Sequence, residues 1–153
     1  MTILTRFEAA RHLLTQLVRD EGQFIESCRE WDAVPFEPYD SLAELTAGWA
    51  NRDKPFLISS LHSDRTIYTE PSANWYFRLW HDTLHVHYQK DITFEDELWL
   101  SDQHCNAAHK LGRDAEVLMH IDTAGQSVFC KRTGAFPEDQ ITWAFGRFVT
   151  LLG

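Results

Sequence analysis

Apolar residues recur at helical spacing along most of this chain, and that periodicity constrains its fold more than any other feature. In the first segment, Thr5 to Trp31, they return every three or four residues, as in a helix with one buried face. Five further segments of this kind are Ser41 to about Asn51, Ser72 to Tyr88, Phe94 to Lys110, Asp114 to about Cys130, and Pro137 to Leu152. We therefore expect a mainly α fold, a single-domain helical bundle of five or six helices over residues 1–153.

Hydrogen-bonding residues mark the starts of several of these segments. Thr5-x-x-Glu8 and Ser41-x-x-Glu44 are capping-box patterns, in which the first side chain accepts a hydrogen bond from the backbone N–H three residues on. Thr93 stands in the same position before the fourth segment. These patterns predict where three helices begin.

Residues 55–69 have a different character. Pro55–Leu61 and Arg65–Thr69 are short and rich in residues that favour strands, and they flank the turn-like triplet His62-Ser63-Asp64. A two-stranded hairpin is weak by itself. We expect a small inserted β-hairpin at about 55–69 that packs against the helices.

The charge balance and the cysteines limit the functional classes. The chain has 14 Lys and Arg against 23 Asp and Glu, a formal charge of -9, which argues against duplex nucleic acid or an anionic membrane surface as a partner. The negative charge remains compatible with a small-molecule, phosphorylated substrate that is held through a metal ion. No signal peptide or membrane span is evident, and the three cysteines form no C-x-x-C pair. We expect a cytoplasmic protein with reduced thiols, whose aromatic surface would allow a homodimer.

The histidines gather in three consecutive predicted helices. Six of the eight histidines fall there: His81, His85, His87, His104, His109 and His120. His81 and His85 are four residues apart and share one helix face. Glu97 and His104, seven apart, share a face of the next helix. Glu116 and His120 do so on the third. Packing of the three helices would bring several of these side chains to a common interior.

Such a set of side chains favours a divalent metal ion. Neutral imidazole binds Zn, Fe, Mn and Ni, and carboxylates compensate the charge; burial of many titratable groups without compensation is costly. The sequence does not distinguish among these metals. The candidate ligands are His81, His85, Glu97, His104 and His120. Asp82 and Asp122, which lie one residue from His81 and two residues from His120, are either further ligands or acceptors that fix a histidine tautomer.

The heptapeptide Leu79-Trp80-His81-Asp82-Thr83-Leu84-His85 resembles the apolar-apolar-His-Asp-x-x-His element of the HD-domain metal-dependent phosphohydrolases. That superfamily is helical, and its members use a His, a His-Asp pair and a later Asp to hold one or two divalent metals that hydrolyse phosphate esters, often of nucleotides. The resemblance implies that His81 and Asp82 are the central pair, Asp122 the later Asp and His62 the first His.

Three functions remain open. The favoured one is a metal-dependent hydrolase of a phosphate ester, with Glu97 or His85 as general base and Arg78 or Arg65 pairing with the phosphate. The second is a non-haem iron or di-iron helical protein, which also uses helix-borne His and Glu ligands. The third is a non-enzymatic interaction or regulatory protein with a structural histidine cluster.

Overall fold

The computed structural model describes residues 1–153 and is mainly helical, which confirms the expected fold class. The helices are α1 (Ile3–Glu26), α2 (Leu42–Ala50), α3 (Pro71–Tyr88), α4 (Phe94–His109), α5 (Arg113–His120), α6 (Gln126–Thr133) and α7 (Gln140–Leu152). A π-helical segment, η1 (Ile121–Gly125), joins α5 to α6 without a break. The two short strands are β1 (Trp31–Val34) and β2 (Phe56–Ser59).

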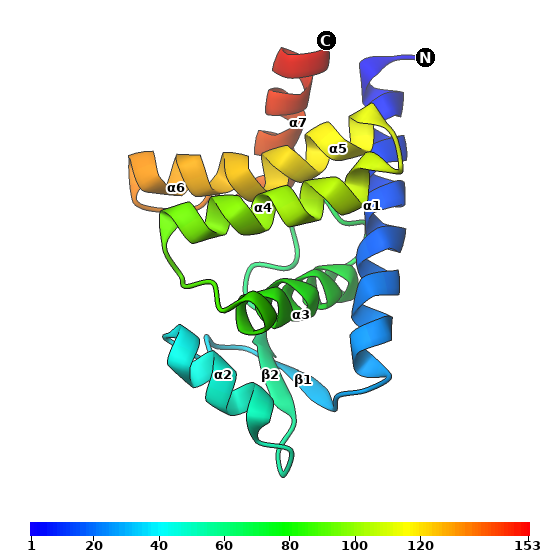
Figure 1. The fold of residues 1–153 in the computed structure, drawn as a ribbon. Helices are drawn as coiled ribbons and strands as arrows, with labels where there is room; N and C mark the ends of the chain where they lie inside the picture. The colour runs from blue at the N-terminus through cyan, green and yellow to red at the C-terminus, as the bar shows by residue number, and fades with distance from the viewer.

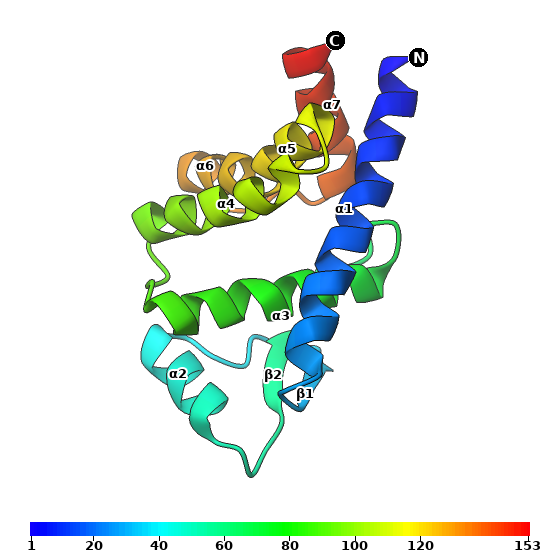
Figure 2. The ribbon, with the colours of Figure 1, turned by 45° about the vertical axis from the view of Figure 1, so that its right-hand side comes forward.

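The longest helix, α1, runs along one side of the molecule past the ends of α3, α4 and α5 (Figure 1). Its buried residues include Phe7, Leu14 and Val18, spaced as a single helix face requires. That face meets fully buried side chains of other helices, among them Leu118 and Phe148. The strands and α2 lie at the end of the molecule away from both termini (Figure 2). None of the helices combines the length and apolar character needed to cross a bilayer.

The capping predictions are right for two helices and wrong for one. The Ser41 hydroxyl accepts from the backbone N–H of Glu44, and Thr93 caps α4 in the same way. Helix α1 begins three residues earlier than the pattern predicts, because Thr2 rather than Thr5 supplies the cap.

The predicted hairpin at about 55–69 is wrong in its pairing. β2 pairs in parallel with β1, with Trp31 opposite Phe56, and α2 forms the crossover that two parallel strands require. Residues 65–69 form no strand. Helix α1 satisfies three of their backbone groups instead: Arg11 donates to the carbonyls of Ile67 and Tyr68, and the N–H of Thr69 donates to Thr15.

Helix α1 ends at Glu26, five residues before the predicted Trp31, and this frees β1 to pair. Arg29, which lies between α1 and β1, is only 3% exposed. Its guanidinium donates to five backbone carbonyl groups, three of them at the end of α2, and faces no carboxylate. The five carbonyls are those of Glu30, Gly48, Trp49, Asn51 and Lys54. Arg29 thus ties the end of α1 to the β1–α2–β2 unit.

Candidate metal centre

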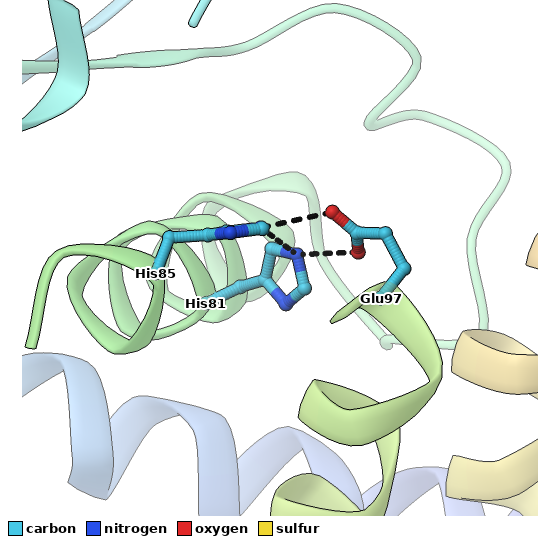
Figure 3. A group of neighbouring side chains, drawn as sticks. All are labelled: His81, His85 and Glu97. Carbon is cyan, nitrogen blue, oxygen red and sulfur yellow. Dashed lines mark hydrogen bonds and ion pairs between the residues drawn. The ribbon is translucent and has the colours of Figure 1, made fainter. Parts of the chain in front are cut away.

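Two histidines of α3 and one glutamate of α4 point toward each other across the space between these helices (Figure 3). His81 and His85 lie one turn apart on one face of α3. Glu97 lies in the first turn of α4, at the place set by the Thr93 cap. These three residues form the one group of three or more His, Cys, Asp or Glu side chains in the chain whose ligand atoms all lie within 4.8 Å of one another.

The spacing of the ligand atoms suits a single divalent ion. The two Nε2 atoms lie 3.1 Å apart, and the Glu97 oxygens lie 3.1 Å from Nε2 of His81 and 2.9 Å from Nε2 of His85. Ligands about 2.1 Å from an ion are separated by about 3.4 Å in a tetrahedral site and about 3.0 Å in an octahedral one. The three side chains therefore match metal coordination without large rearrangement.

The backbone fixes the tautomer of His85. Its Nδ1 lies 2.7 Å from the carbonyl oxygen of Lys90, and because a carbonyl only accepts, Nδ1 carries the hydrogen. In the neutral ring this leaves the lone pair of Nε2 free to bind a metal ion. The Lys90 carbonyl turns back toward His85 because Gln89, at the end of α3, has a left-handed backbone with φ 52°. A second ring nitrogen bound to a carbonyl is typical of metal-ligating histidines.

The electrostatics favour positive charge at the point of convergence. Burial by itself would raise the pKa of Glu97, but the charges and hydrogen bonds of His81 and His85 lower it well below its ordinary value. Burial opposes the charged form of His85, yet Glu97 and the Lys90 carbonyl raise the pKa of this imidazole. A cation between these groups, whether a proton or a metal ion, compensates the buried carboxylate.

One side of the triad opens into a cavity of about 650 Å³. His81 and Glu97 line it, so a ligand held by the triad would meet the cavity's contents. Three other predicted metal ligands line the same cavity: Asp82 from α3, Asp122 from η1, and His62 from the loop after β2. Three protein ligands with an open side are the arrangement of catalytic rather than structural metal sites.

The π-helical segment η1 carries Asp122 and Thr123 on the cavity wall. Gln126 Nε2 donates to Asp122 Oδ1 at 2.9 Å and holds the carboxyl group in place. Thr123 lies 2.6 Å from Ser101 of α4, and that serine accepts from the N–H of Ala124. Single π-turns inside α-helices occur often at functional sites. The apolar periodicity of the sequence predicted one uninterrupted helix here and carried no signal for this turn.

Two carboxyl groups of the cavity, those of Asp82 and Asp122, are held at a cost. Burial raises the pKa of Asp82 to about 6 and that of Asp122 to about 7, although His81 and His85 oppose the first shift, and Tyr68 and Arg78 the second. A carboxyl group kept in such surroundings destabilises the fold when it ionises. Carboxyl groups with raised pKa values on a cavity wall are found more often at functional sites than elsewhere.

The remaining predicted residues are placed as follows. Arg78 lines the cavity and donates to the carbonyl of Leu61 at 2.8 Å. Arg65 is 61% exposed at its side chain, pairs with Asp139 and does not line the cavity. His104 lies behind His81, with its Nε2 2.9 Å from His81 Nδ1.

The expectation that His120 would join the other histidines is wrong. Its side chain is exposed and lines a separate surface pocket with Asp102. The residues on either side of it, Met119 and Ile121, are buried and fix the inward face of the helix. Asp122, two residues further on and about 200° away around an ideal helix, faces the cavity instead.

Comparisons of this chain with protein-family models, curated proteins and solved structures found no match. The chemistry of the site therefore has to be inferred from its own residues.

Proposed function

We propose that this protein is a metal-dependent hydrolase in which His81, His85 and Glu97 hold one divalent ion. The observation that carries the proposal is the convergence of their ligand atoms at 2.9–3.1 Å beside an open cavity. A His₂Glu set with an open position is the donor set of several zinc hydrolases. When bound there, the ion would polarise a substrate oxygen and lower the pKa of bound water.

The proposed placement changes the roles expected for Glu97 and His85. Their carboxylate and Nε2 atoms face the same point as Nε2 of His81, so we assign both as ligands rather than as general base. We assign Asp122 as the base in this proposal. It lines the cavity from η1, and Gln126 holds its carboxyl group. It would accept a proton from the attacking water.

The proposed substrate is a phosphate ester, in line with the resemblance to the HD-domain phosphohydrolases. Arg78 supports it as the one Lys or Arg on the cavity wall, four residues before Asp82 on α3. The same wall also carries the acidic residues Glu37 and Glu138. A phosphate would therefore depend on both the metal ion and Arg78 for its binding.

The test is metal content combined with hydrolysis. Protein purified without chelator is analysed for bound metals, then stripped and reloaded with Zn²⁺, Mn²⁺ or Fe²⁺ and assayed with bis(4-nitrophenyl) phosphate. His81→Ala and Glu97→Gln should lose both metal and activity. The matched control is His109→Ala, which breaks an exposed His–Glu pair on α4 and α5 at 2.8 Å and should keep both. A metal-free, inactive wild type that fails to reload contradicts the proposal.

The same triad supports a second candidate, a mononuclear non-haem iron protein. Two histidines and one carboxylate with open positions form the facial triad of Fe(II) oxygenases. Iron as the retained metal, with an absorption change on exposure to oxygen and no hydrolysis of bis(4-nitrophenyl) phosphate, would favour this candidate over the hydrolase.

A further inference from the structure

We infer that His104 is a positioning residue that fixes the orientation and tautomer of His81. This inference rests on the proposed metal site and deepens it. His104 lies on α4, two turns after Glu97, so one helix supplies both a ligand and the group behind another ligand. Its Nε2 lies 2.9 Å from Nδ1 of His81, on the side of that ring away from Glu97.

The burial of His104 is unfavourable for stability. The residue is 0% exposed, and its Nδ1 has no hydrogen-bond partner. Trp80 packs against the ring in a T-shaped contact with 4.3 Å between centroids, and Phe77 lies 4.9 Å away. A buried polar atom without a partner costs about 1–3 kcal/mol. An apolar side chain would fill this space without that cost, so packing alone does not explain a histidine here.

The tautomers of His81 and His104 explain the one hydrogen bond that His104 makes. If His81 offers the lone pair of Nε2 to an ion, its hydrogen must be on Nδ1. That hydrogen is then donated to Nε2 of His104, which leaves the hydrogen of His104 on Nδ1, the atom without a partner. His104 thus does for His81 what the Lys90 carbonyl does for His85. Partners of this kind orient the ligand ring, and their loss weakens metal binding about 10–100-fold.

The experiment compares metal affinity with stability in the full chain. Zn²⁺ affinity is measured by competition with a chelating dye, and the free energy of unfolding of the metal-free protein by urea. His104→Leu should be at least as stable as wild type and bind Zn²⁺ about 10–100-fold more weakly. His104→Gln, whose amide oxygen can accept from Nδ1 of His81, should recover most of the affinity.

Ser101→Ala is the matched control. Ser101 is buried on α4 about one turn before His104, and its hydroxyl bonds Thr123 and the N–H of Ala124 but no residue of the triad. This variant should lose stability and keep its Zn²⁺ affinity, the opposite of His104→Leu.

Three results would overturn the inference. One is a Zn²⁺ affinity of His104→Leu equal to that of wild type. Another is a His104→Leu protein that loses Zn²⁺ affinity only because it is less stable than wild type. The third comes from nitrogen-15 NMR of the zinc-loaded wild type, if the hydrogen of His104 is found on Nε2. A wild type that binds no Zn²⁺ would instead defeat the metal site itself, so the two failures are distinguishable.

Discussion

Replacement of Asp122 by asparagine should stabilise the protein at neutral and alkaline pH. In the folded protein, burial raises the pKa of this carboxyl group to about 7 from an ordinary value of 3.8. Between about pH 4 and pH 7 the folded state therefore keeps a proton that the unfolded state has released. Stability falls as the pH rises through this window, because the folded state then binds more protons. The Asp122→Asn substitution removes this titration, and its amide oxygen keeps the acceptor that Gln126 uses.

The magnitude follows from the shift and from the position of the group. A shift of about three pKa units corresponds to about 4 kcal/mol, which is an upper bound because Asp122 is only partly buried and faces the cavity. We expect Asp122→Asn to be more stable than wild type by about 1–2 kcal/mol at pH 8, after that discount for solvent. The two proteins should be equally stable near pH 4.

Urea denaturation at pH 4, 5.5 and 8 measures this difference. Asp114→Asn is the control of opposite sign, because the hydrogen bonds and charge of Arg6 lower the pKa of Asp114. That variant should be less stable than wild type at pH 8 by about 0.5–1 kcal/mol, as expected for a partly exposed pair, with the loss shrinking as the pH falls below 4. A difference for Asp122→Asn that does not change with pH, or one that makes it less stable at pH 8, would refute the reasoning.

Three further changes have definite expected outcomes. Saturating Zn²⁺, 100-fold above its dissociation constant, should stabilise the protein by about 2.7 kcal/mol and raise the thermal midpoint by roughly 5–10 °C; Glu97→Gln should abolish the rise seen by calorimetry. Arg29→Met should cost about 3–5 kcal/mol in urea denaturation, because it leaves five carbonyl groups without their charged donor, and a near-neutral result would show that water replaces it. Arg78→Met should weaken inhibition of hydrolysis by inorganic phosphate about tenfold, the loss of one charge-assisted hydrogen bond, and unchanged inhibition would exclude this residue from substrate binding.

The parts of the site that depend on one helix were predictable from the sequence. The four-residue spacing of His81 and His85 predicts a common face, and the structure places their Nε2 atoms 3.1 Å apart. The Thr93 cap predicts the start of α4, which puts Glu97 in its first turn. These relations need only helix geometry and capping chemistry, both of which act over four residues or fewer.

The parts that depend on distant segments were not predictable in the same way. The strand preference of Phe56–Ser59 is local, but its partner β1 lies across the whole of α2. Residues 65–69 have the composition of a strand, and it was Arg11 and Thr15 on α1 that provided their hydrogen bonds instead. Local composition shows that such a backbone needs partners without showing where the partners are.

Asp122 and His120 show the same limit at the level of single side chains. Glu116 and His120 have the same four-residue spacing as His81 and His85. Only His81 and His85 face the interior site, however. What decides is the side of α5 that packs inward: Met119 and Ile121 are buried, and His120 between them is exposed. Asp122, two residues further along in η1, lies on the side that faces the cavity.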